Sequence, residues 1–319
     1  MGIKSNRSVE VYYDYFAASG YDAAKPIPSP IVVWGDRGLY GGGDLGGTWN
    51  IIDYISIPST GNATDFGDLT VARDSAAGSS NSTRGVWLGG RGSSWDTVID
   101  YVTIASTGNA TDFGDLTTGR MVNNGCSSDV RALVQGGWNG GNITNIEYIT
   151  IATTGNGTEF GDLTQARHNS AGSGDGTYGL CAGGHSGGYV NTIDYVTIAT
   201  TGNSTDFGDL TNVKYAMAGC PHSTRGTFFG GYTDTPSGQY EDNIDYVTIA
   251  TPGNATNFGN MTTGWGWVGA CGNDTRATKG GGEPNTNVIE YVTVATTGDA
   301  SDFGDLTQTR WAPSGLSGD

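Results

Sequence analysis

The sequence predicts an all-β protein, a six-bladed β-propeller whose first blade is closed by the C-terminal strand. A unit of about 47 residues recurs six times, each copy with a Gly-Gly pair, an Ile-(Asp/Glu)-Tyr tripeptide and a Phe-Gly dipeptide. Each unit contains four short strand patterns separated by turn residues, which is typical of propeller blades. The repeat region also begins and ends with complementary fragments of one unit.

The tyrosines of the tripeptide mark the period. Their spacings are 47, 47, 47, 51 and 45 residues, and they are Tyr54, Tyr101, Tyr148, Tyr195, Tyr246 and Tyr291. Units of this size cannot each bury a core alone. We therefore expect one propeller over residues 31–319, preceded by an N-terminal arm and Pro-rich linker over residues 1–30.

Residues 73–117 illustrate one unit. Small residues at 75–79 suit an inner strand, and residues 84–90 predict a second strand that ends in the glycine pair. Residues 98–104 are rich in β-branched and aromatic side chains, which favours a third strand. A turn at 106–109 precedes the fourth strand at 111–116. The second and third strands are joined by a "2–3 loop", and a "4–1 connection" leads to the next blade.

The two ends of the chain predict ring closure. Residues 36–43 begin at the second strand of a unit, whereas residues 310–319 match a first strand with no second strand after it. In the alignment of the repeats Asp319 runs into Asp36. The C-terminal strand is therefore expected to complete the first blade and to remove the exposed sheet edges of an open array.

Two resemblances follow from the repeat. Gly89-Gly90, Tyr101 and Phe113 resemble the kelch unit, with Phe in place of the kelch tryptophan. The wording of residues 197–211, nearly repeated in other copies, resembles marine bacteriophage proteins, particularly cyanophage virion components. This resemblance implies a structural or adhesive particle protein, such as a tail, fibre, collar or capsid-surface subunit.

Composition narrows the partners. The net charge of −17 argues against direct nucleic-acid binding, which needs clustered Lys and Arg. No apolar run approaches the roughly 20 residues of a membrane-spanning helix, and no secretory signal is visible. Cys126, Cys220 and Cys271 share one repeat position in different units, so we expect these thiols and Cys181 to be free and buried, in a reducing cell.

Several motifs suggest chemistry that the rest of the sequence does not support. Asp65-Phe66-Gly67 matches the kinase magnesium motif, but no catalytic-loop or nucleotide-loop motif accompanies it. The Asn-Ala-Thr sequons and their neighbouring carboxylates suit turns better than glycosylation or a calcium loop. Three histidines, His168, His185 and His222, show no metal or triad spacing. We therefore expect no enzyme activity, no catalytic residues, no cofactor and no metal.

Differences between the six copies indicate a candidate binding face. The 2–3 loops differ between copies, and so does the residue that follows the arginine, or the residue in its place, in the 4–1 connection. Both parts are expected to open on one face of a propeller. Variable aromatics above an invariant scaffold are typical of recognition, although unconstrained loops that drift would look the same. The candidate residues are Trp49, Trp95, Trp138, Tyr189, Tyr232, Tyr240, Met121, His168, Tyr215 and Trp311.

The N-terminal arm completes the functional prediction. Tyr12, Tyr13, Tyr15 and Phe16 suggest docking to another virion protein through residues 1–30. The sequence thus predicts a non-enzymatic virion module, compatible with a symmetric oligomer on the particle, that presents its variable face to a host-surface glycan or protein, or to neighbouring subunits. A lectin-like or carbohydrate-active propeller and a cytoplasmic scaffold propeller remain alternatives.

Overall fold

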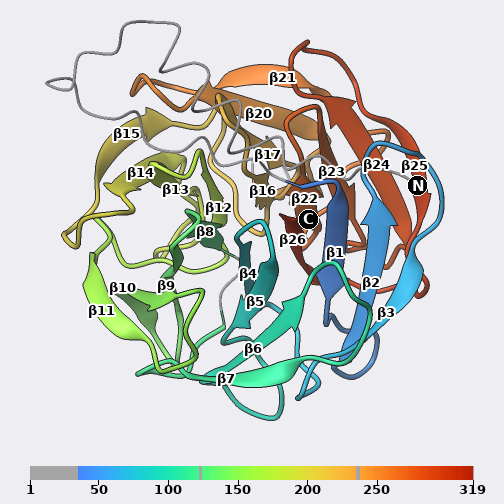
Figure 1. The fold of residues 1–319 in the computed structure, drawn as a ribbon. Helices are drawn as coiled ribbons and strands as arrows, with labels where there is room; N and C mark the ends of the chain where they lie inside the picture. Colours follow the sequence, from blue (N-terminus) through green and yellow to red (C-terminus); the bar gives the residue numbers. More distant parts are fainter. Residues whose placement is uncertain (1–34, 122–123, 235–237, 319) are drawn as a thin grey trace, which may run out of the picture. The chain divides into compact units, whose positions relative to one another are not determined.

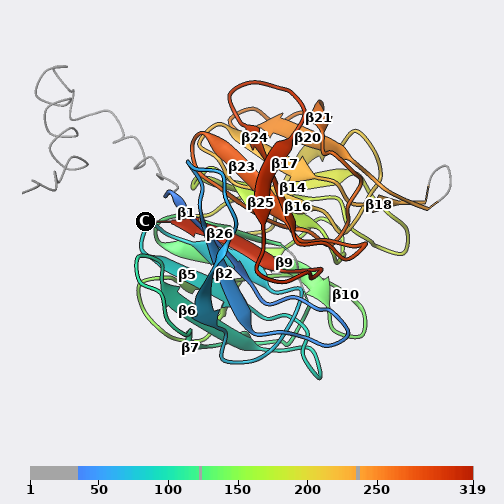
Figure 2. The same ribbon diagram turned by 90° about the vertical axis from the view of Figure 1, so that its right-hand side faces the viewer.

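The computed structural model of the chain describes residues 35–121, 124–234 and 238–318. They form an all-β propeller of six four-stranded antiparallel blades (Figure 1), as the sequence predicts. We number the blades 1 to 6 in chain order, beginning with the blade that contains β1. An additional two-stranded hairpin, β18–β19, belongs to the 2–3 loop of blade 5, and β18 extends away from the ring in the side view (Figure 2).

The first three blades contain the following strands. They are β26 (Ser314–Gly318), β1 (Arg37–Gly41), β2 (Ile51–Ser56) and β3 (Thr64–Asp68) in blade 1; β4 (Ala77–Ser80), β5 (Arg84–Leu88), β6 (Val98–Thr103) and β7 (Thr111–Asp115) in blade 2; and β8 (Gly125–Ser127), β9 (Arg131–Trp138), β10 (Asn142–Thr150) and β11 (Thr158–Asp162) in blade 3.

The other three blades follow the same order. They comprise β12 (Ala171–Gly174), β13 (Tyr178–Ala182), β14 (Thr192–Thr197) and β15 (Thr205–Asp209) in blade 4; β16 (Ala218–Cys220), β17 (Arg225–Phe229), β20 (Asn243–Thr248) and β21 (Thr256–Asn260) in blade 5, with β18 (Tyr232–Thr233) and β19 (Gln239–Tyr240); and β22 (Gly269–Gly272), β23 (Arg276–Gly280), β24 (Val288–Thr293) and β25 (Ser301–Asp305) in blade 6.

Blade 1 is assembled from distant parts of the chain. β26 pairs antiparallel with β1, and Leu316 lies opposite Leu39 in this ladder. The strand order is β26-β1-β2-β3, and β26 also contacts the inner strands β22 and β4 of the two neighbouring blades. The predicted closure of the ring by the C-terminal strand is confirmed.

The inner strands begin later than the sequence predicts. In blade 2 the strand was expected from Ser75, but β4 begins at Ala77. Ser75 has a left-handed φ of 54°, and its N–H donates to the carbonyl of Ala312 in blade 1. The glycine pair also lies beyond the end of its strand, because Gly89 and Gly90 have φ values of 62° and 117°.

The repeated arginine of the second strand joins neighbouring blades. In blade 2 the rings of Tyr101 and Phe113 meet edge to face with centroids 5.9 Å apart. The Arg84 guanidinium lies 4.4 Å from the Tyr101 centroid and donates to the Ile151 carbonyl of blade 3 at 2.8 Å. These contacts combine a cation–π interaction with a hydrogen bond between blades, which gives the arginine of this repeat position a structural role.

A buried ion pair lies within each blade. In five blades the cation precedes the inner strand, in the pairs Arg310–Asp53, Arg73–Asp100, Arg120–Glu147, Arg167–Asp194 and Lys214–Asp245. In blade 6 Trp265 takes the cation's position, and Lys279 of β23 supplies the charge with its Nζ 3.3 Å from Glu290 Oε2. Lys279 Nζ also lies 4.9 Å from the centroid of the Trp265 ring. All six blades have the carboxylate at the same repeat position, whereas in blade 6 the cation comes from a different position, in β23.

The Thr-Gly-Asn turn forms a second contact between blades. The Asp68 N–H donates to Asn109 Oδ1 at 3.1 Å, and the Gly108 N–H donates to the Phe66 carbonyl at 2.8 Å. A Cβ on Gly67 would lie 2.5 Å from the Gly108 carbonyl carbon, which excludes a side chain there. The sequon asparagine therefore has a structural role in joining the blades.

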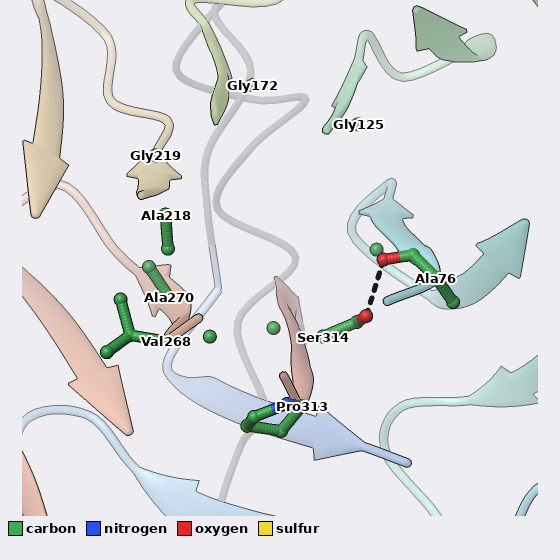
Figure 3. A pocket seen from close by; sticks show the side chains of 12 residues that line it. Ala76, Gly125, Gly172, Ala218, Gly219, Val268, Ala270, Pro313 and Ser314 are labelled. Atoms are coloured by element: carbon green, nitrogen blue, oxygen red, sulfur yellow. Dashed lines mark hydrogen bonds between the residues drawn. The ribbon is translucent and has the colours of Figure 1, made fainter. Parts of the chain in front are cut away.

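Small residues close the centre of the ring. A Cβ on Gly172 would lie 2.3 Å from the Gly125 carbonyl oxygen, and one on Gly219 would lie 2.1 Å from the Gly172 oxygen. Blade 6 has Ala270 at this position (Figure 3). The space left here on the axis measures about 30 Å³, which is enough for water but not for a larger ligand.

The four cysteines are free and buried, as the sequence predicts. Burial raises the pKa of Cys271 to about 11, and burial also raises the pKa values of Cys126 and Cys220. Because the thiolate is the reactive form of cysteine, these three thiols are inert near neutral pH.

Candidate binding face

One face of the ring brings together the parts of the repeat that differ most between copies. In every blade the variable residue of the 4–1 connection forms a backbone bridge with the first residue of a 2–3 loop. The bridges are Asp44–Trp311, Asp74–Arg91, Met121–Trp138, His168–His185, Tyr215–Tyr232 and Gly266–Glu283. The 2–3 loops and the 4–1 connections therefore open on the same face.

Nine rings on this face form a continuous series of contacts, which we call the aromatic belt. Successive ring centroids in the series are 4.5–6.5 Å apart. The closest pair, Tyr189 and Tyr215, is stacked with an interplanar angle of 13°. In order, the belt consists of Trp138, His168, His185, Tyr189, Tyr215, Tyr232, Tyr240, Trp267 and Trp311.

Burial favours the neutral forms of three rings of the belt, His168, Tyr189 and Tyr215. Burial, followed by the proximity of His185, lowers the pKa of His168 to about 4, and His168 Nδ1 lies 2.6 Å from Asn142 Oδ1. Burial also raises the pKa values of Tyr189 and Tyr215, so both phenols keep their protons. The belt therefore offers ring faces and neutral hydrogen-bonding groups.

The central axis of the ring opens beside the belt, at what we call the mouth of the axis. One residue of the repeat has a left-handed backbone conformation there. The φ values there lie between 48° and 61°, a region that non-glycine residues seldom adopt, at Ser75, Asn169, Ala216, Trp267 and Ala312. At four of these positions the N–H donates to the neighbouring blade; for example, Trp267 donates to the Ala216 carbonyl at 2.7 Å, and Ala312 donates to the Trp267 carbonyl at 2.6 Å. These bonds fix the backbone at the mouth.

A cavity of about 450 Å³ lies at this mouth, and every blade contributes to its lining. Small-molecule sites in proteins typically measure about 300–1,000 Å³. Three belt rings line the cavity, and Asn169, only 5% exposed, has an Oδ1 without a hydrogen-bond partner among the described residues. The described residues that line it are Ser75, Arg91, Met121, Asn169, Tyr240, Trp267, Glu283 and Trp311.

The guanidinium of Arg91 is paired with the carboxylate of Asp74. Its Nη2 and Nε donate to Asp74 Oδ2 at 2.9 and 3.1 Å, while its guanidinium lies 5.5 Å from the Trp311 centroid. Burial raises the pKa of Asp74, and the charge of Arg91 opposes this shift. With Arg91 paired, Glu283 contributes the remaining formal charge of the lining, which is negative.

The sequence-predicted site residues divide into three groups. Trp138, His168, Tyr189, Tyr215, Tyr232, Tyr240 and Trp311 belong to the belt. Met121 lines the cavity without belonging to the belt. Trp49 and Trp95 lie in 2–3 loops but outside both the belt and the cavity lining, and Trp95 is 43% exposed. The arm residues Tyr12, Tyr13, Tyr15 and Phe16 lie outside the described residues.

Sequence reasoning missed Trp267 and the polar lining of the cavity. Trp267 follows the variable position by one residue, where four of the other five copies have Ser75, Asn169, Ala216 and Ala312. Comparing that second position between copies could have identified it. Arg91 and Glu283 lie in loops recognised as variable, but only aromatic side chains were selected there.

Across residues 35–121, 124–234 and 238–318, no group of three or more His, Cys, Asp or Glu side chains is arranged to hold a metal ion. No helix within the same ranges has the length and apolar character needed to cross a membrane.

Comparisons with known proteins leave the fold and the site as the basis for a functional proposal. No protein-family model matches the chain, and no curated protein matches it either.

Proposed function

We propose that this chain is a non-enzymatic, kelch-like interaction module of a virion, which presents the aromatic belt to a host surface or to a neighbouring subunit. The observation that carries the proposal is the aromatic belt itself. It consists of residues that vary between repeats, and it lies on one face of a ring whose blade-to-blade contacts recur. Rigid scaffolds with variable surface residues are typical of recognition proteins.

The chemistry of the belt favours binding over catalysis. Its most acid-base-like pair, His168 and His185, has ring centroids 5.2 Å apart. The polar partner of His168 is the amide of Asn142, and its pKa of about 4 makes it a poor base at neutral pH. Aromatic rings with neutral polar neighbours bind ligands well without supplying a nucleophile.

The virion assignment rests on the wording of the repeat, which resembles bacteriophage particle proteins. In this proposal residues 1–30 anchor the chain to another virion protein, and the ring assembles in the host cytoplasm before it becomes part of the particle. Several copies in symmetric positions would multiply weak contacts at the aromatic belt, because linked sites raise the effective local concentration.

Purified particles test the proposal. Mass spectrometry should find the chain in particles, and a chain that begins at residue 35 should fold but fail to be incorporated. Trp267→Ala in the full chain is the matched control: it should be incorporated normally and weaken attachment. Normal incorporation of the shortened chain would refute the anchoring role, and absence of the chain from particles would refute the virion assignment in favour of a cytoplasmic scaffold.

A lectin-like function is the second candidate. The observation in its favour is the cavity at the axis mouth, where Tyr240, Trp267 and Trp311 meet a polar lining.

A further inference from the structure

We propose that the cavity at the mouth of the axis is a binding site for a neutral hexopyranose residue of a glycan. The inference deepens the proposed recognition function by naming the ligand class of the same face, and it can be tested independently of any particle. It rests on the aromatic walls of the cavity, on its unpaired polar groups and on its closed floor.

The aromatic walls fit the shape of a sugar ring. The indole rings of Trp267 and Trp311 have centroids 6.3 Å apart and are inclined by 74°, and Tyr240 lies 6.5 Å from Trp267 by the same measure. Because the two indoles are steeply inclined, one can present its face to a sugar ring while the other presents its edge. The CH groups on one side of a pyranose carry partial positive charge, which the negative face of an indole attracts.

The polar groups fit sugar hydroxyls. Asn169 is 5% exposed and its Oδ1 has no hydrogen-bond partner among residues 35–121, 124–234 and 238–318. A buried oxygen left without a donor costs free energy, and a ligand hydroxyl would supply that donor. The Glu283 carboxylate, also in the lining, is a second acceptor for a hydroxyl of the same ring.

The charges favour a neutral sugar over an acidic one. Both Nε and Nη2 of Arg91 are bonded to Asp74, so the one cation that the described residues contribute to the cavity lining is already neutralised. Glu283 leaves the lining negative, and the chain carries a net charge of −17. A carboxylate or sulfate on the ligand would be repelled at this site.

The floor of the cavity keeps the ligand at the mouth. Below Ser75, Asn169 and Trp267 the axis narrows to a space of about 30 Å³ between the inner strands. Figure 3 shows Gly125, Gly172, Gly219 and Ala270 around this space. A ligand therefore enters and leaves by the face that carries the aromatic belt, as a terminal sugar of a surface glycan can.

Binding of glycans by the purified full-length chain tests the inference. The probes are an array of glycans with neutral hexose, N-acetylhexosamine, uronic acid and sialic acid termini, followed by titration of tryptophan fluorescence with the methyl glycoside of the preferred sugar. Binding to neutral hexose or N-acetylhexosamine termini is expected, with a dissociation constant for one sugar on the order of millimolar, since a single small ring forms few contacts.

The variants use residues that the fold itself places at the same repeat position. Trp267→Ala and Asn169→Ala put alanine where blades 5 and 1 have Ala216 and Ala312 in the same left-handed conformation, so both should fold. Each should weaken binding about tenfold or more, equivalent to about 1.4 kcal/mol. Trp49→Ala, on the same face but outside the cavity lining, should bind like the wild type.

Three results would overturn the inference: no binding to any neutral glycan, binding to acidic termini alone, or equal affinity in the wild type and both cavity variants. A protein or peptide partner would give the first of these. Failure here leaves the virion proposal intact, because particle incorporation is measured separately. Conversely, a chain that is absent from particles but binds neutral glycans would refute the virion proposal and support the cavity.

Discussion

Arg310 and Asp53, which are 257 positions apart in the sequence, form a fully buried ion pair with Nη2 3.1 Å from Oδ2. Arg310 also donates to the Tyr40 carbonyl at 3.1 Å, and Asp53 accepts a hydrogen bond from the Thr307 hydroxyl at 2.6 Å. The pair links the segment that precedes β26 to β2, the third strand of blade 1. It therefore holds the ring closed from inside the blade.

Removing this cation should open the ring. Arg310→Ala leaves the Asp53 carboxylate buried without its cation, and breaking a buried pair in this way costs about 3–5 kcal/mol. Denaturant unfolding measures the change. Val130→Ala, at a side chain that is 59% exposed, is the control and should change stability by less than about 0.5 kcal/mol. Equal unfolding midpoints for the two variants would contradict the role of Arg310.

Two glycines that face each other between blades 4 and 3 should respond differently to alanine. A Cβ on Gly161, where φ is +158°, would lie 2.3 Å from the Gly202 carbonyl oxygen, whereas a Cβ on Gly202 would meet nothing within 4 Å. Gly161→Ala should lower stability by about 2–3 kcal/mol, through strain and steric conflict. Gly202→Ala should stay within about 0.5 kcal/mol of the wild type. Thermal unfolding of both variants measures these changes. A Gly161→Ala variant as stable as the wild type would show that the two blades can move apart to accommodate a Cβ.

The moved cation of blade 6 predicts strong coupling between two positions. Lys279→Val alone should cost about 3–5 kcal/mol, because Glu290 loses its cation. Trp265→Arg alone puts a second cation beside Lys279 and should also destabilise the protein. Together the two substitutions recreate the set Arg120, Val134 and Glu147 of blade 3.

A double-mutant cycle measures this coupling. The double variant should recover most of the stability lost by Lys279→Val, with a coupling energy of about 2 kcal/mol. Additive losses would mean that the position of the cation in blade 6 is not interchangeable with that in blade 3.

His168 should make the belt sensitive to acid. Its pKa is lowered from 6.5 to about 4 in the folded chain, mainly by burial. Between these values the unfolded chain binds a proton that the folded chain does not, so stability falls as pH decreases from 6.5 to about 4. Because the ring is only partly buried, the loss should be about 1–2 kcal/mol.

The variant His168→Gln isolates this effect. Its stability should follow that of the wild type above pH 6.5 and should decline less steeply below it, as measured by denaturant unfolding at a series of pH values. Parallel profiles for the two proteins between pH 6.5 and 4 would show that the pKa of His168 is the same in the folded and unfolded chains.

The fold was predictable because its determinants recur. Six copies of the strand and turn patterns gave the number of blades, and the complementary fragments around Asp36 and Asp319 gave the closure. The left-handed start of the inner strands was not predictable from one copy, because Ser75 adopts it in order to bond to Ala312 of the neighbouring blade. That bond exists only when the ring is curved and closed.

The candidate site was predictable only in part for the same reason. Aromatic residues in variable positions could be selected from the sequence, and seven of the ten selected residues belong to the belt. The cavity depends on which positions meet at the axis. Trp267 and Glu283 belong to blade 6, whereas Asn169 belongs to blade 4 and Trp311 to blade 1, and closure of the ring brings the three blades together at the axis.

Amide hydrogen exchange of residues 314–318 tests the central claim most directly, because Trp311 reaches the cavity only if the strand after it completes blade 1. In the closed ring these amides should exchange as slowly as those of the equivalent inner strand 171–174, since local protection reflects the free energy of opening. Exchange at the rate of an unstructured peptide in 314–318, with 171–174 still protected, would mean that the ring is open and that the proposed binding face is not formed.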